Sequence, residues 1–253
     1  MRVRALAAAV VSLVLAADDS RSDPPAGQVE ARALIEWAVK AHGGAEKLAK
    51  LRAVRRKMKG TLWVNGEAVP VAVERIDQLP GRSRVTQELE FEGQPVTIVS
   101  VLNGGKAWNS FNGDTQEARA EFRARRQEEM HALLVESLVP LLKRRGFGLA
   151  HLGEIKVSGR AAVGVKVTAE GRPDVDLYFD KGSGLLVKSA YRGQDEFERE
   201  VLRECFLSAY KETAGLKRPT KFQVLQDGVK ASEHEVVETT FEEKFEESEF
   251  AKP

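Results

Sequence analysis

The amino-acid sequence predicts a mainly β fold with helices: a large curved antiparallel sheet, an open half-barrel of about 11 strands, covered by a helical lid. Apolar and polar side chains alternate with period two along most of the 253 residues. Turn signals such as Asn65-Gly66 separate the alternating segments. Helical periodicity appears at 28–51 and 115–145. A sheet of this size must curl, and these two segments are the ones that could cover it.

The first 17 residues have the features of a signal peptide. Two arginines in the first four positions precede an uncharged, mostly apolar run that reaches Ala17. This run is shorter than the roughly 20 apolar residues that a membrane-spanning helix needs. We therefore expect cleavage after Ala16 or Ala17, a polar disordered leader at 18–27, and a single periplasmic domain at 28–253.

Composition argues against several classes of protein. The chain has 39 basic and 38 acidic side chains, a net charge of +1, which gives no sign of a nucleic-acid binder. Cys205 is its one cysteine, so no internal disulfide can form. Because Cys205 shares a strand face with Val201 and Leu207 in the alternating pattern, we expect a small buried apolar side chain.

The first helical segment is broken in the middle. Apolar residues recur at helical spacing over 28–42, and Gly43-Gly44 then ends the helix, since glycine relieves the strain of a left-handed C-cap. A second short helix follows at 45–51. We expect the broken helix to lie across the end or the mouth of the sheet.

Five strands are predicted between Val54 and Phe111. Their alternation gives one mainly apolar face, which we expect to line the concave side of the sheet. The strand at 95–102 is apolar on both faces and should be covered on both. The predicted lining residues from the sheet are Met58, Leu62, Val64, Val71, Val73, Val85, Leu89, Val96 and Ile98.

The middle of the chain, 115–145, is predicted to form the lid. Pro140 lies inside its helical pattern, so either one long helix is kinked or a second short helix begins at Ser137. The basic residues from Arg119 to Arg126 form either a solvated helix face or a surface for anionic lipid head groups. The lid residues expected to face the cavity are Met130, Leu133, Leu134 and Leu138.

About seven further strands follow, with explicit turns such as Asp227-Gly228 between them. This regular spacing predicts a second antiparallel meander. The predicted strands are at 153–159, 161–170, 174–181, 185–192, 198–211, 219–227 and 230–241.

Four stretches resemble the periplasmic outer-membrane lipoprotein-sorting family, which has the LolA/LolB-like fold: HGGAEKLAKLR, GVKVTAEGRPDVDLYFDKGSGLLVKSAYR, GLKRPTKF and the C-terminal EFAKP. The resemblance implies an open half-barrel with a helical lid, acyl chains held between the two, and no metal or cofactor. It also implies a clamp arginine near the lid, for which Arg75 and Arg84, on early strands, are the candidates.

No catalytic or metal-binding pattern stands out. The four histidines are scattered, and His234-Glu235-x-x-Glu238 lacks the second histidine of a zinc-protease motif and lies in a predicted strand. We therefore expect a protein that is not an enzyme and that has no metal ion.

The sequence thus predicts a carrier that holds acyl chains in an apolar cavity, and the resemblance implies a role in outer-membrane lipoprotein sorting. Burying one methylene group contributes about 0.8 kcal/mol, so a lid that closes imperfectly would keep release feasible. The alternative is an envelope-stress sensor of the same fold that detects lipids or lipoproteins and binds a membrane regulator. Expected partners are acyl chains and transient membrane proteins, not nucleic acid, and we expect a monomer.

Overall fold

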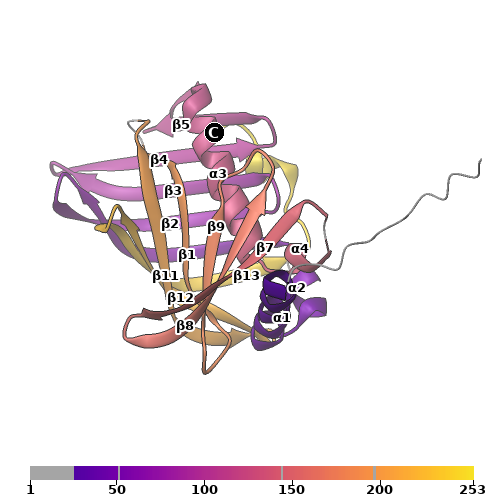
Figure 1. Cartoon of the computed structure of the whole chain (residues 1–253). Helices are drawn as coiled ribbons and strands as arrows, with labels where there is room; N and C mark the ends of the chain where they lie inside the picture. The colour runs from indigo at the N-terminus through magenta and orange to yellow at the C-terminus, as the bar shows by residue number, and fades with distance from the viewer. Residues whose placement is uncertain (1–25, 51, 144, 196–197) are drawn as a thin grey trace, which may run out of the picture.

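The computed structural model describes residues 26–50, 52–143, 145–195 and 198–253 (Figure 1). The predicted signal peptide and the predicted leader up to residue 25 lie outside this part of the chain. Ala26 and Gly27, which we expected to end the leader, already belong to the first helix.

The described residues form one antiparallel sheet of 13 strands that curves without closing, which confirms the predicted fold class. The strand order is β6-β5-β4-β3-β2-β1-β13-β12-β11-β10-β9-β8-β7, so the two meanders join where β1 pairs with β13. The strands are β1 (Ala53–Val64), β2 (Glu67–Gln78), β3 (Arg82–Phe91), β4 (Gln94–Asn103), β5 (Lys106–Phe111), β6 (Asp114–Glu117), β7 (Phe147–Val157), β8 (Arg160–Ala169), β9 (Val175–Asp180), β10 (Leu186–Gln194), β11 (Glu200–Thr213), β12 (Leu216–Gln226) and β13 (Val229–Glu242).

Four α-helices and one short 3₁₀ helix accompany the sheet in the described residues. Pro140 lies in the first turn of the fourth helix, where no backbone N–H donor is needed, so the lid segment is two helices and not one kinked helix. Leu138, with φ of 63°, marks the break between them. The helices are α1 (Ala26–Ala41), α2 (Ala45–Lys50), α3 (Ala120–Glu136), α4 (Val139–Lys143) and η1 (Glu247–Phe250).

Two predicted boundaries were wrong. Residues 114–117 pair with β5 as the short strand β6, so the lid helix begins at Ala120 and not at 115. β7 begins at Phe147, six residues before the predicted strand, and continues through the region we assigned to a turn. In both places pairing with a neighbouring strand overrides the local preference of the sequence.

α1 lies at the β7 end of the sheet, and α3 runs across the inside of the curve (Figure 1). Ala31, Ile35 and Ala38 of α1 are fully buried in the largest hydrophobic cluster, which also contains the inward side chains of β8 and β9. The break after α1 is required locally, because Gly43 has φ of 117° and a Cβ there would lie 2.4 Å from the carbonyl oxygen of Gly215. α1 is therefore part of the core, and α3 alone covers the middle of the trough.

The outer face of the first meander is covered by the C-terminal segment, residues 243–253. Phe245 and Phe250 are buried there against a group of apolar residues of β1, β2, β4 and β5. This explains how β4 can be apolar on both faces. The outward residues that they cover are Ala53, Ile76, Val99, Val101 and Trp108.

Candidate functional site

The strand pairing places all nine predicted lining residues of the sheet on one face. Met58 pairs with Val73, Val85 with Arg75, and Leu89 with both Val71 and Val96, so their side chains point to the same side. Arg75, on this same face, contacts α3. The predicted lining is therefore the inner face of the trough, toward the helix.

We call the central part of this face the apolar floor. It consists of Met58, Leu62, Val71, Val73, Val85, Leu89 and Val236. Met58, Val71 and Val73 are buried and the others are half-buried. Of the remaining predicted residues, Val96 is buried, Ile98 is half-buried, and Val64 lies exposed near a hairpin tip.

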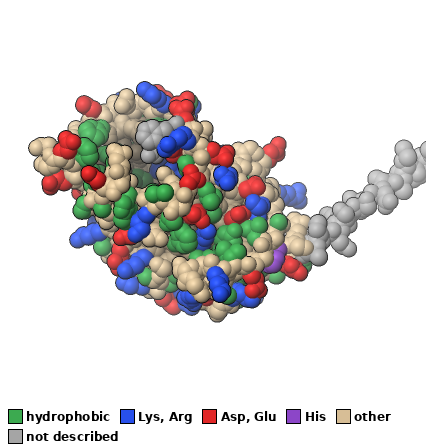
Figure 2. Space-filling view, turned by 60° about the vertical axis from the view of Figure 1, so that its left-hand side comes forward, with side chains coloured by type: hydrophobic (Ala, Val, Ile, Leu, Met, Phe, Trp, Pro, Cys, Tyr) green, Lys and Arg blue, Asp and Glu red, His purple; other side chains and the backbone are tan. Residues whose placement is uncertain are grey.

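The floor becomes exposed toward the hairpin tips of the first meander. Val64, Phe91 and Phe111, on the inner face by their pairing, are 42 %, 50 % and 56 % exposed. Figure 2 shows hydrophobic side chains among charged ones on the side of the molecule that bears these tips. Apolar surface thus continues from the buried floor to the open end of the trough.

The predicted lid residues divide between core and cavity. Met130 packs against Leu102 and Ala107 at one end of α3, and Leu138 is buried in the largest cluster. Leu133 lines the space beneath the helix. Leu134 is half-buried.

Two adjoining pockets lie between α3 and the sheet, with volumes of about 130 and 160 Å³. Both are lined by Arg56, Leu133, Glu136 and Phe222, so they are neighbouring parts of one space, which we call the inner cavity. The second pocket also reaches Met58 and so meets the apolar floor. The inner cavity therefore combines apolar and charged walls.

A network of buried charges joins α3 to the sheet. Arg75 donates from Nε to Asp77 at 2.7 Å and from Nη1 to Glu129 of α3 at 2.6 Å. Asp77 also accepts from Arg56 at 2.8 Å and from the Ser83 hydroxyl at 2.9 Å. Arg126 of α3 donates to Glu129 and to Ser83. Between them these residues make a continuous latch from helix to strands.

The latch holds its groups in their charged forms. Burial by itself would raise the pKa of Asp77 and Glu129, but the neighbouring arginines lower both. Burial would likewise lower the pKa of Arg75, and its two carboxylate partners raise it instead. Glu136 differs, because burial raises the pKa of its carboxyl, which accepts a hydrogen bond from Ser189 at 2.6 Å.

The structure distinguishes the two candidate clamp residues by position. Arg75 contacts the lid helix, whereas Arg84 pairs with Ile76 and Val101, two residues of the outer face. Arg126, which we grouped with a solvated or lipid-facing basic surface, points inward and is buried. Arg56 was not among the predicted cavity residues, and its alternation in phase with Met58 on β1 was the available signal that it faces the cavity.

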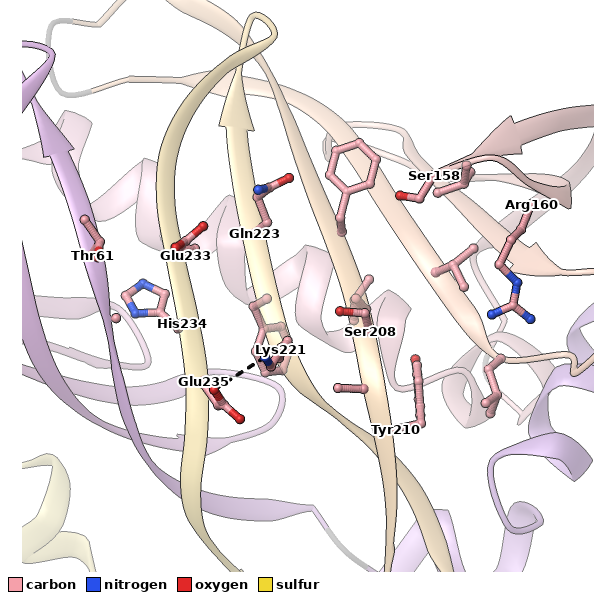
Figure 3. A pocket seen from close by; sticks show the side chains of 18 of the residues that line it. Thr61, Ser158, Arg160, Ser208, Tyr210, Lys221, Gln223, Glu233, His234 and Glu235 are labelled. Atoms are coloured by element: carbon pink, nitrogen blue, oxygen red, sulfur yellow. Dashed lines mark ion pairs between the residues drawn. The ribbon is translucent and has the colours of Figure 1, made fainter. Parts of the chain in front are cut away.

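A larger pocket of about 820 Å³ lies elsewhere on the sheet (Figure 3). Thr61, Gln223 and Glu233 lie side by side on β1, β12 and β13, beside the ion pair of Lys221 with Glu235 at 3.6 Å. By pairing, these side chains lie on the face opposite the apolar floor. The rest of the wall includes Val157, Leu185, Val187 and Phe206, so this pocket has both polar and apolar walls.

Among the described residues, none of the helices is both long and apolar enough to cross a membrane. In the same part of the chain, no three His, Cys, Asp or Glu side chains are grouped so that they could hold a metal ion. Cys205 lines the inner cavity, and burial raises the pKa of its thiol, as expected for an apolar role rather than a reactive one.

No family model and no curated protein sequence matches the chain. Solved structures do match in shape. A DUF1329 family protein from Desulfovibrio piger has a TM-score of 0.57 at 10 % identity, over 87 % of this chain and 97 % of that one.

Two further structures carry more specific descriptions. A LolA superfamily protein from Nitrosomonas europaea has a TM-score of 0.54 at 11 % identity, and an outer membrane lipoprotein-sorting protein domain from Vibrio parahaemolyticus has 0.52 at 10 % identity. Each alignment covers 88 % of this chain and 97 % of the other. Together with the open sheet and its inner helix, these matches show that the chain has the LolA-like fold.

Proposed function

We propose that the protein binds acyl chains of lipid or lipoprotein along the apolar floor and carries them through the periplasm in outer-membrane lipoprotein sorting. The observation that supports this most is the inner apolar face, which runs from the buried Met58 to the exposed Phe91. Such a surface can bind an apolar chain, and this role requires no catalysis. The lipoprotein-sorting domain with the same fold adds support for the cargo.

The gradient of exposure along the floor suits reversible loading. Each methylene group that leaves water contributes about 0.8 kcal/mol, so a 16-carbon chain that was fully enclosed would gain on the order of 12 kcal/mol. A chain that lies partly at the exposed tips gains less. Because a membrane or a second carrier offers similar apolar surroundings, the chain can then leave without crossing water.

α3 would act as the lid, with Arg75 as its clamp. Ligand pockets commonly have volumes of about 300–1,000 Å³. The two inner pockets, of about 130 and 160 Å³, are smaller, so a complete acyl chain requires α3 to move. Ion pairs hold α3 to β2, and Ala132 and Val135 of α3 are also buried in the largest cluster together with α1. Movement of α3 therefore has to separate this apolar packing as well as the ion pairs.

The test places a charge on the floor and a matched charge on the other face. Leu62→Glu puts a carboxylate on the half-buried edge of the floor, and Thr61→Glu puts one on the adjacent outward position. We expect Leu62→Glu to weaken binding of a fluorescent fatty acid by about tenfold or more, because a buried charge is costly. Thr61→Glu should bind like the wild type, and equal affinities in both variants would refute the proposed floor.

Lipid recovered with the protein provides an independent measurement. Native mass spectrometry of the protein purified from its envelope should show adducts, and organic extraction should yield acyl-containing species. A carrier should also release lipoprotein from inner-membrane vesicles into solution. Binding of lipid with no release, together with capture of a membrane regulator, would instead support the sensor alternative.

A further inference from the structure

Arg218 of β12 is a half-buried cation on the wall of the inner cavity. Its Nε has no solvent contact and no hydrogen-bond partner. Arg218 also forms no ion pair with any residue in the described part of the chain. Its guanidinium lies over the ring of Phe241, 5.8 Å from the centroid. It lines the inner pocket of about 130 Å³. Burial, with Arg56 as a second cause, lowers the pKa of Arg218 to about 10, so the side chain remains charged at neutral pH.

The surroundings do not supply the missing negative charge. Arg56, on the same pocket, lies over the ring of Phe222 at 5.7 Å and already shares Asp77 with Arg75. The Glu136 carboxyl also lines this pocket, but it accepts a hydrogen bond from the Ser189 hydroxyl at 2.6 Å and forms no ion pair with Arg218. Arg203 adds a third buried Nε without a partner in the adjoining pocket.

The remaining polar groups of this pocket are satisfied by the protein. His42 donates from Nδ1 to the carbonyl of Ala38 at 2.8 Å, and burial lowers its pKa to about 4, so it is neutral. The Tyr210 hydroxyl donates to the carbonyl of Leu186 at 2.5 Å. Among the described residues, Nε of Arg218 and Nε of Arg56 are the buried donors of this pocket that have no hydrogen-bond partner.

The walls lead from this cation to the apolar floor. Phe222 and Leu133 line both pockets, and Met58 and Val224 line the second. Met58 also belongs to the apolar floor, which continues to the exposed tips. An occupant with a charged end at Arg218 could thus extend an apolar tail outward along one continuous surface.

We infer that the inner cavity binds the anionic head group of an acyl amphiphile, a carboxylate or phosphate, between Arg218 and Arg56, with the acyl chain on the apolar floor. This rests on the proposed function for the chain and adds the chemistry of the head group. A planar guanidinium suits both carboxylate and phosphate oxygens. The anion supplies the charge that the fold leaves out, and no metal or covalent step takes part.

The test compares ligands that differ only in the head group. Dodecanoate, dodecyl phosphate and 1-dodecanol share one chain, and inorganic phosphate has none. Equilibrium dialysis against the full chain should show both anions binding at least about tenfold more tightly than the alcohol, as expected for hydrogen bonds to a charged group. Arg218→Met should reduce anion binding to the level of the alcohol, and leave the alcohol within about twofold.

Arg84→Met is the matched control, because it removes an arginine from the outer face and should alter none of these affinities. If Arg218→Met does not fold, the head-group site can still be tested. The wild type and Arg218→Lys are then compared for their binding of the two anions and the alcohol. Equal binding of anion and alcohol would overturn the head-group site and leave the proposed floor standing. If none of the three dodecyl compounds binds, both the head-group site and the proposed apolar floor are overturned. Inorganic phosphate that binds as tightly as dodecyl phosphate would reveal a free-anion site and overturn the amphiphile.

Discussion

Arg75 joins β2 to α3, the helix that we propose as the lid. It is the one side chain of the latch that touches both Asp77 on its own strand and Glu129 on α3. The two carboxylates stay charged in a buried setting because arginines surround them. A buried ion pair of this kind adds little net stability over apolar packing, but removal of one partner is costly.

We therefore predict that Arg75→Met destabilises the protein by about 3 kcal/mol, since it leaves Asp77 and Glu129 buried with fewer cations. Urea unfolding provides the measurement. Arg84→Met, on the outer face, should remain within about 0.5 kcal/mol of the wild type. Amide exchange in α3 should accelerate in Arg75→Met only, and identical behaviour of the two variants would show that Arg75 does not hold the lid.

At this scale the alternation of the sequence predicts which way a side chain faces, but not what it does there. Met58 and Val73 lie on the inner face as expected. Arg56 and Arg218 share that face, yet Arg56 binds Asp77 of the neighbouring strand β2, and Nε of Arg218 has no partner among the described residues. A charged residue on a strand usually faces solvent. The burial of an arginine can therefore be recognised only from the folded structure, in which the sheet curls and α3 covers the side chain.

Among the elements, α1 is held by apolar packing, whereas α3 combines apolar packing of Ala132 and Val135 with the charged latch. α1 contributes fully buried apolar side chains to the main cluster, and its C-terminal end is fixed by His42. The imidazole ring of His42 accepts a hydrogen bond at Nε2 from the backbone N–H of Leu186 at 3.4 Å. The backbone carbonyl of His42 accepts a second one from the backbone N–H of Lys217 at 3.1 Å. The joint between α1 and the sheet therefore requires a neutral imidazole.

This requirement predicts a dependence of stability on pH. The pKa of His42 is lowered from 6.5 to about 4 by burial, so its contribution is complete above pH 6.5 and is lost as the pH falls toward 4. Between pH 7 and pH 5 we expect His42 to account for a loss of about 2 kcal/mol. Urea unfolding of His42→Gln should show a correspondingly shallower dependence. An unchanged slope would mean that the ring is protonated without cost in the folded protein.

The elements that the sequence predicts well are those with strong internal patterning. α1, the Gly43-Gly44 break and α2 follow from helical spacing and glycine geometry. β6 has four residues and no alternation of its own, so only pairing with β5 makes it a strand. Secondary structure that arises from a neighbour leaves little signal in its own residues.

The whole molecule is one sheet with two different faces, each closed by a different segment. α3 covers the inner face and leaves the tips open, whereas the C-terminal segment covers the outer face of the first meander. The sequence of that segment, EKFEESEFAKP, is mostly charged, so its covering role was not predicted. Only Phe245 and Phe250 indicate it, and their receiving surface is assembled from four strands.

The last prediction separates the two faces. Phe250 is fully buried on the outer face, and its carbonyl accepts a hydrogen bond from the Asn103 side chain at 3.3 Å. Phe250→Ala should cost about 3–5 kcal/mol, because a large cavity opens beside Val101 and Ile76. It should leave the affinity for dodecanoate within about twofold at temperatures where the variant stays folded, since no residue of the floor is touched.

Thermal unfolding and equilibrium dialysis on the same samples measure both quantities. Glu243→Ala, at an exposed position in the same segment, is the control and should alter neither. If Phe250→Ala weakened binding as strongly as Leu62→Glu, the outer segment and the floor would be energetically coupled through the sheet. The two faces could then no longer be treated as independent, and the C-terminal segment would have to be included in any account of how the trough opens.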